Sequence, residues 1–194
     1  SERSVDVLRL GRQPTIWDDD QSTKARLEEI GLNFSGRPPG TDEIGSYVQL
    51  LSENLRQTKC VLAHSNLADD ARYTPPTKEY ITARWTDAFA CGCLVTGAQP
   101  RSDPLFSCID PAAVIDIDPN SGDGGLSELR SSLKDWTPDL SRQIHDMALR
   151  EFDWRWRIRD LAHRLGRATD KVDAEISEIQ KRLALSAPIG VRPV

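Results

Sequence analysis

The sequence predicts an α/β fold in which helices flank a mostly parallel sheet. Short apolar runs alternate with segments of helical periodicity up to residue 117, and this alternation is typical of parallel sheets. The segment 79–97 contains one such unit, because a helical pattern ends at Gly92 and the apolar run 93–97 follows at once as a buried strand. After residue 126 the patterns are helical only, which predicts a long helical extension at the C-terminus.

The order of the elements follows from these patterns. Strands are predicted at 5–10, 32–35, 59–64, 93–97 and 113–117, and helices at 22–30, 43–56 and 79–91. Helix 43–56 places its apolar residues on one face, namely Ile44, Tyr47, Val48, Leu51 and Leu55. The C-terminal part is predicted to be helical from 126 to about 185, with an interruption at Thr137-Pro138, because proline breaks a helix interior.

The predicted helix 79–91 carries two carboxylates, Glu79 and Asp87, eight residues apart. On an α-helix this spacing corresponds to about 12 Å of rise and roughly 80° of rotation, so one helix could touch two ends of an extended ligand. Thr77 follows two prolines that cannot extend the helix backward, and we predict that it is the N-cap. The free amide groups of the first turn would then favour a diphosphate at this end.

Composition limits the classes of protein and of site. The 194 residues suit a single domain, and 25 basic against 30 acidic side chains give a net charge of −5, which argues against broad binding to nucleic acid. No apolar run is long enough to span a membrane and the N-terminus lacks a signal-peptide pattern. We therefore expect a cytoplasmic protein, and a place at the inner face of the membrane stays open. The cysteines at 60, 91, 93 and 108 match no zinc spacing, so no metal is expected.

The segment that begins at Glu79 resembles a motif of nucleotide-sugar-dependent glycosyltransferases of the GT-B fold. In the C-terminal domain of that family, a Glu, seven residues and a second Glu stand in the context E-A-M-A-C-G-x-P-V-V. Here Glu79 and seven residues are followed by D-A-F-A-C-G-C-L-V-T, with Asp87 in place of the second Glu and Leu94 in place of Pro. With Leu62-Ala-His-Ser65 and Asp153-Trp-Arg-Trp-Arg157, the chain looks most like the bacterial spore-maturation (group 1) branch, over about residues 4–166. This resemblance implies a Rossmann-like domain, half of a GT-B enzyme.

The resemblance also implies site residues at the carboxyl ends of the strands, where open α/β sheets bind ligands. It assigns catalytic roles to Glu79, near the sugar hydroxyls, and to Arg12, whose guanidinium suits a diphosphate. The residues expected to bind the donor are Gly11, His64, Ser65, Thr77, Tyr80, Arg84 and Asp87. Structural roles stay open: Arg12 as a solvated side chain, His64 as a hydrogen-bonded residue, and Arg84 as an ion-pair partner of a nearby carboxylate.

For the whole chain, the resemblance implies the donor-binding domain of a retaining, metal-independent glycosyltransferase, hexosyltransferase-like and acting in polysaccharide biosynthesis. The donor substrate would be a nucleoside diphosphate sugar such as a UDP-sugar, and no cofactor would be required. An N-terminal acceptor-binding domain would be the partner, so this chain alone would bind the donor but transfer poorly. Two alternatives stay open: a non-catalytic sugar-nucleotide-binding or interaction module, and an unrelated doubly wound domain such as a receiver or a reductase half.

Three further patterns are interpreted as structural. Asp18-Asp19-Asp20 contains the Asp-x-Asp with which GT-A enzymes hold a divalent ion, but its place before a polar helix favours helix capping or a solvated acidic loop. Asp116-x-Asp118-x-Asn120 begins like a calcium loop and lacks the later Gly and Glu, so a turn is predicted. The run 122–125 is glycine-rich but lacks the Lys-Ser/Thr of a phosphate loop.

Two apolar stripes follow in the C-terminal helices. The first consists of Trp154, Ile158, Leu161 and Leu165, and residues 150–167 hold six Arg against three acids. Such interleaving can bind an anionic or sugar-bearing surface, although a structural stripe is expected. The second nearly keeps a coiled-coil spacing and consists of Leu165, Ala168, Val172, Ile176, Ile179 and Leu183. This stripe needs a partner, either the N-terminal domain or a second copy. We divide the chain into a nucleotide-sugar-binding domain at 1–166, a helical extension at 167–185 and a flexible tail at 186–194.

Overall fold

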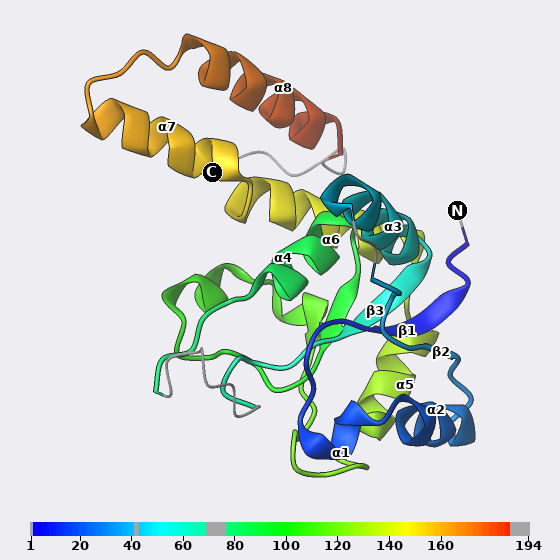
Figure 1. Ribbon diagram of the computed structural model, residues 1–194. Coiled ribbons are helices and arrows are strands. Elements are labelled where there is room, and N and C mark those ends of the chain that lie inside the picture. The colour runs from blue at the N-terminus through cyan, green and yellow to red at the C-terminus, as the bar shows by residue number, and fades with distance from the viewer. Residues whose placement is uncertain (1, 41–42, 69–76, 187–194) are drawn as a thin grey trace.

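The computed structural model describes residues 2–40, 43–68 and 77–186. A five-stranded sheet lies at its centre (Figure 1), with all strands parallel and in the order β2-β1-β3-β4-β5. The strands are β1 (Val5–Arg9), β2 (Phe34–Ser35), β3 (Thr58–Leu62), β4 (Leu94–Thr96) and β5 (Val114–Ile115). Each strand overlaps its predicted range, and the predicted α/β fold with a parallel sheet is confirmed.

Helices cover both faces of the sheet (Figure 1). One face carries α3 (Ile44–Arg56), α4 (Ala83–Ala90) and α6 (Pro138–Glu151), and the other carries α1 (Thr15–Asp18), α2 (Asp20–Glu29) and α5 (Leu126–Lys134). For α2, α3 and α4 the division follows from right-handed crossovers, because the chain moves from β1 to β2 in one direction and from β2 to β3 and β4 in the other. Two 3-10 helices, Pro104–Cys108 and Pro111–Ala113, lie between β4 and β5.

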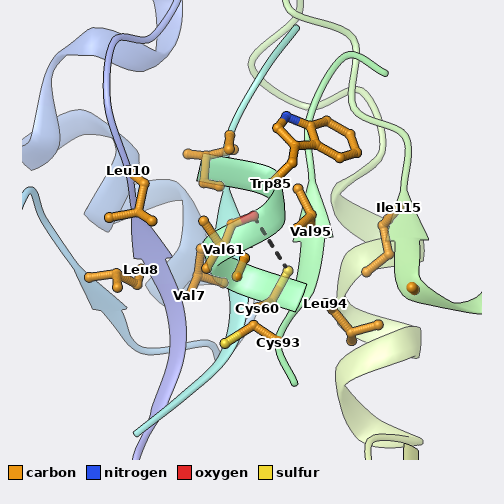
Figure 2. Packing of buried hydrophobic residues seen from close by; sticks show 14 of the residues in the cluster. Val7, Leu8, Leu10, Cys60, Val61, Trp85, Cys93, Leu94, Val95 and Ile115 are labelled. Carbon is orange, nitrogen blue, oxygen red and sulfur yellow. Dashed lines mark hydrogen bonds between the residues drawn. The ribbon is translucent and has the colours of Figure 1, made fainter. Parts of the chain in front are cut away.

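Apolar side chains of the strands form the core. Val7, Val61 and Val95 are fully buried, as expected for parallel strands that are covered on both faces. Figure 2 shows these side chains packed together with Trp85 of α4. Phe89 lies on the same helix, and its ring stacks on Phe152 at a centroid distance of 6.1 Å, which attaches the end of α6 to α4.

The helix predicted at 79–91 starts later than expected, and Thr77 is not its N-cap. α4 begins at Ala83 with Thr82 as the N-cap, so Glu79 precedes the helix and only Asp87 lies on it. The prediction of two carboxylates on one helix was therefore wrong.

Side chains from distant loops bind the segment before α4. The backbone N–H of Tyr80 donates to Oδ1 of Asn66 at 2.9 Å, and that of Ile81 donates to Oδ2 of Asp103 at 2.8 Å. These bonds tie residues 80 and 81, which precede the helix, to loops that are far away in the sequence.

The apolar face of α3 is only partly covered. Leu55 is buried and Leu51 is half-buried, whereas Ile44, Tyr47 and Val48 are exposed. The helix therefore packs on the sheet through its C-terminal half, and its N-terminal half presents apolar side chains at the surface.

The C-terminal region folds into α7 (Trp154–Arg164) and α8 (Asp170–Ser186). Figure 1 shows them side by side as an antiparallel hairpin at the end of the molecule away from the sheet. Ile176 and Ile179 of α8 are buried, and they lie outside the core cluster of the sheet. None of the described helices is long and apolar enough to cross a membrane.

Candidate functional site

The carboxyl ends of β1 and β3 lie next to each other in the sheet, where Arg9 pairs with Leu62. From β1 the chain crosses to β2 on one side, and from β3 it crosses to β4 on the other. Open α/β sheets bind their ligands at such a switch point, outside the carboxyl ends of the strands. The loops that follow β1 and β3 are therefore the first place to look for a site.

Buried side chains fill the gap directly between these two strand ends. Gln13 is buried and its Nε2 donates to the backbone oxygens of Leu10 and Leu62, at 3.0 and 3.2 Å. The ring of Trp17 is fully buried and lies 6.2 Å from that of His64. The open space consequently lies to one side of the switch point, towards α3 and α4.

A cavity of about 580 Å³ occupies that space. It is lined by Leu10, Gly11, Arg12, Tyr47, Leu51, Tyr80, Ile81, Thr82, Ala83, Arg84 and Asp87. Five residues of the sequence-predicted site meet here, namely Gly11, Arg12, Tyr80, Arg84 and Asp87. The volume falls within the usual range for small-molecule sites, which is about 300–1,000 Å³.

Gly11 lets Arg84 lie against the turn after β1. Its φ is +69°, and a Cβ added there would come within 2.5 Å of Cδ and 2.8 Å of Nε of Arg84. The Nη1 atom of Arg84 also donates to the backbone oxygen of Arg12 at 2.9 Å. The glycine therefore permits a close approach that places the guanidinium of Arg84 at the end of β1, beside Arg12 in the cavity lining.

Thr82 adds a polar group that the sequence did not single out. It is the N-cap of α4, yet its side chain makes no capping hydrogen bond, and its Oγ1 is buried without a hydrogen-bond partner among the described residues. A buried hydroxyl without a partner is costly, and Thr82 is one of the residues that line the cavity. The first amides of α4 belong to the same end of the helix, where anions are favoured.

Asp87 lies one turn further along α4 and lines two cavities. The second cavity has a volume of about 400 Å³ and lies where α4, α6, α7 and α8 meet. Burial raises the pKa of the Asp87 carboxyl. A half-buried carboxylate at a cavity wall is a suitable acceptor for hydroxyl groups of a ligand.

Glu79 lies outside this cavity and joins two loops. Ser65 Oγ donates to its Oε1 at 2.8 Å, and Ser102 donates to its Oε2 through N at 3.0 Å and through Oγ at 2.8 Å. Burial by itself raises the pKa of Glu79, but the hydrogen bonds from Ser102 and Ser65 outweigh it and the pKa lies below its ordinary value. The carboxylate therefore holds the loop after β3 against the loop after β4.

His64 and Thr77 also lie away from the cavity. The Nδ1 of His64 accepts a hydrogen bond from the N–H of Ala98 at 3.0 Å. Burial, together with the positive charge of Arg84, lowers the pKa of His64 to about 4, so the ring is neutral at pH 7. Thr77 is exposed, and it is not the N-cap of α4. Of the nine predicted site residues, five thus line the cavity beside β1. Three others, Glu79, His64 and Ser65, lie at the loops after β3 and β4.

The acidic triplet serves structure. Asp19 caps α2 by accepting from the N–H of Ser22 at 2.6 Å, while Asp18 and Asp20 form ion pairs with the buried Arg9. The predicted capping role is confirmed.

The other pattern and the cysteines have structural surroundings too. Asp118 accepts from the N–H of Asn120 at 2.8 Å, as a turn requires. Within the described residues, no three His, Cys, Asp or Glu side chains lie close enough to hold a metal ion. Burial raises the pKa of Cys93 to about 12.

Six of the eleven lining residues were not predicted from the sequence, and two of these carry a hydroxyl group, Tyr47 and Thr82. Tyr47 belongs to the apolar face of α3 and was counted there as a packing residue. Comparison of the chain with known protein families, with curated proteins and with solved structures gives no match.

Proposed function

We propose that this chain is the donor-binding domain of a nucleotide-sugar-dependent glycosyltransferase, and that the cavity beside β1 binds the nucleoside diphosphate. The observation that carries the proposal is the meeting of Arg12 and Arg84 with the N-terminal end of α4 in one cavity. Two guanidinium groups and a helix N-terminus match the two charges of a diphosphate, and guanidinium groups bind phosphate oxygens with bidentate geometry.

The remaining cavity residues suit the rest of a nucleotide. The hydroxyl of Thr82 would gain a phosphate oxygen as its missing partner. Asp87 would accept hydrogen bonds from the ribose hydroxyls, because its half-buried carboxylate lines the same space. Tyr47 and Tyr80 provide aromatic faces on which a base can stack.

In this proposal, catalysis consists of positioning the donor and stabilising the leaving diphosphate. Arg12, Arg84 and the amides of α4 would act on the charge that develops on the diphosphate as the glycosidic bond breaks. Glu79 would act indirectly, because it fixes the loops after β3 and β4 at the carboxyl edge of the sheet. The acceptor and any further catalytic group would come from the proposed N-terminal domain.

Calorimetric titration of the folded chain with UDP, GDP and their sugars tests the proposal. We expect saturable binding, and Arg84→Ala should weaken it by about tenfold to a hundredfold, since a hydrogen bond to a charged group contributes about 1.5–3 kcal/mol. Arg101→Ala is the matched control, because Arg101 is exposed, pairs with Asp116 and lies outside the cavity. If no nucleotide bound, the proposed function would be wrong for this chain. If Arg84→Ala and Arg101→Ala bound nucleotide with equal affinity, the ligand would lie outside this cavity.

A second candidate is a sugar-nucleotide-binding module without transferase activity. The observation that favours it is the engagement of Glu79, which the family resemblance assigns to the sugar but whose two oxygens accept bonds from Ser65 and Ser102. The two functions differ in turnover. Because the chain alone is expected to transfer poorly, it is incubated at high concentration with a UDP-sugar and a panel of acceptors. A transferase domain should release UDP slowly but above the rate without protein, whereas a module would return the donor intact at any protein concentration.

A further inference from the structure

The apolar stripe on α7 is uncovered. Trp154, Ile158, Leu161 and Leu165 are 75, 52, 58 and 64% exposed, whereas Ile176 and Ile179 of the neighbouring α8 are 2 and 6% exposed. The hairpin thus covers Ile176 and Ile179 of α8 and leaves the stripe of α7 at the surface, on the part of the molecule that projects from the sheet (Figure 1). Four large apolar side chains in a row on one helix indicate an interaction surface.

The spacing of the stripe is that of a coiled-coil seam. The four residues follow each other at intervals of four, three and four, and they occupy an arc of only about 60° on the helix. A seam this narrow fits between the side chains of one partner helix, while a helix that lies in a membrane surface has a broader apolar face. The geometry therefore favours a helix as the partner.

Arginines border the seam on both sides. Arg157 and Arg164 lie seven residues apart along one border, and Arg155 lies on the other border with the small Ala162. Arg155 is already paired with Asp153 and Glu175, and Arg157 is half-buried and donates to the backbone oxygen of Glu151 at 2.6 Å. Arg164 is exposed and forms no ion pair among the described residues, so it is the most accessible charge of the border. In a coiled coil these bordering positions set the choice of partner through their charge.

The same arginines disfavour pairing of α7 with α7 of a second copy. A symmetric antiparallel pair would bring the row of Arg157 and Arg164 against its own copy, and like charges at these positions repel. We propose that the seam is the docking site for an amphipathic helix of a separate polypeptide, whose apolar seam is bordered by Asp or Glu.

Fluorescence anisotropy with two labelled synthetic peptides tests the proposal on the full chain. Each peptide has about four heptads with Leu at both seam positions, and the bordering positions are all Glu in one and all Lys in the other. We expect the Glu peptide to bind at least about tenfold more tightly than the Lys peptide, with an affinity that falls as salt is raised.

Three variants sharpen the test. Leu161→Asp should abolish binding, whereas Ile44→Asp, at a position that is 84% exposed on α3, should leave it unchanged. Arg164→Glu should lower the affinity for the Glu peptide and raise the affinity for the Lys peptide. Because both Leu161 and Arg164 are exposed, circular dichroism should show each variant folded.

Four results would overturn the proposal. They are equal affinity for the two peptides, binding of neither, dimerisation in light scattering that Leu161→Asp removes, and sedimentation with phosphatidylglycerol vesicles that Leu161→Asp removes. The last two would assign the seam to a second copy or to an anionic membrane. None of these measurements involves the cavity beside β1, so the outcome is independent of nucleotide binding.

Discussion

At the scale of single residues, the candidate site depends on the contact between Arg84 and Gly11 and on Asp87, whereas the nearby carboxylate of Glu79 has a different role. Arg84 lies against Gly11 at the end of β1, where a side chain on residue 11 would collide with it. Asp87 lines the cavity, while Glu79 is held in hydrogen bonds between two loops. For each of these residues, a substitution is expected to change the stability of the chain in a defined direction.

Gly11→Ala should lower stability and displace Arg84. A non-glycine residue at φ +69° costs about 1–2 kcal/mol, and the added Cβ would also move the guanidinium away from the turn. Thermal unfolding and nucleotide titration measure the two effects. Gly31→Ala has a similar φ of +78° with nothing within 4 Å, so it should show the strain alone, and Gly45→Ala, which is inside α3, should stabilise by about 0.5–1 kcal/mol. Equal behaviour of Gly11→Ala and Gly31→Ala would contradict the role of the Arg84 contact.

Asp87→Asn should raise the thermal stability at pH 7. Burial holds the pKa of Asp87 above its value in the unfolded chain, which is about 3.8, so the folded protein binds a proton more tightly and ionisation of Asp87 costs stability as the pH rises. The gain in melting temperature should disappear below that unfolded pKa, where Asp87 is protonated in both states. The same variant should bind nucleotide more weakly.

Glu79→Gln should change the stability at pH 7 in the opposite direction to Asp87→Asn. The pKa of Glu79 is lower in the folded chain than its ordinary value of 4.5, so the carboxylate adds stability above that pH and loses its contribution as the pH falls through the folded pKa. Glu79→Gln should therefore be less stable than the parent at pH 7 and similar to it in acid. Melting curves of both variants that shifted in the same direction at pH 7 would contradict these assignments.

At the scale of elements, α4 decides which residues face the cavity. The helix begins at Ala83, after a segment whose backbone amides bind Asn66 and Asp103, and this start places Thr82 at the cavity. A helix that began at residue 79 would have presented Glu79 and other side chains at its first turn.

Thr82→Val should stabilise the chain by about 1 kcal/mol or more and weaken nucleotide binding. The substitution keeps the shape and removes a buried hydroxyl that has no partner among the described residues, which otherwise costs about 1–3 kcal/mol. Chemical denaturation and calorimetry measure the two quantities. Thr86→Val is the matched control on the same helix, since the Thr86 hydroxyl already donates to the oxygen of Ala83 at 3.2 Å and lies outside the cavity. If Thr82→Val lowered stability, the hydroxyl would have a partner in the folded chain.

At the scale of the whole molecule, the sheet with its flanking helices contains the core and the cavity, whereas the α7–α8 hairpin presents an exposed apolar seam. The core cluster of the sheet includes residues up to Phe152 and none from the hairpin. The cavity beside β1 likewise uses only residues between Leu10 and Asp87. The hairpin instead presents the exposed seam of α7.

A chain truncated after Phe152 should therefore still unfold in one cooperative transition. The stacking of Phe152 on Phe89 is kept, while the removal of α8 uncovers part of α6 and should lower the melting temperature. Far-UV circular dichroism during heating measures the transition, and calorimetry should give the same nucleotide affinity as the full chain. A broad transition without cooperativity would show that the hairpin belongs to the folding unit of the sheet.

Much of the architecture follows from the sequence alone. Apolar runs that are separated by helical patterns determined the parallel sheet, the order of its elements and the place of Gly11 and Arg12 at the end of β1. The acidic residues before α2 also revealed their capping role, because helix capping depends on neighbours within three residues. These features are local, so a local pattern is sufficient to predict them.

Only the tertiary structure decided where α4 begins, which carboxylate reaches the cavity and which apolar stripe is covered. Asn66 and Asp103 are 14 and 22 residues from the amides that they bind, and the exposure of Trp154 depends on where α8 packs. The motif from Glu79 to Gly92 therefore covers a part of the chain that lines the cavity, but it did not show that Asp87 lines the cavity and Glu79 does not. Hydrogen bonds and packing between distant segments set those positions, and periodicity along the chain carries no information about them.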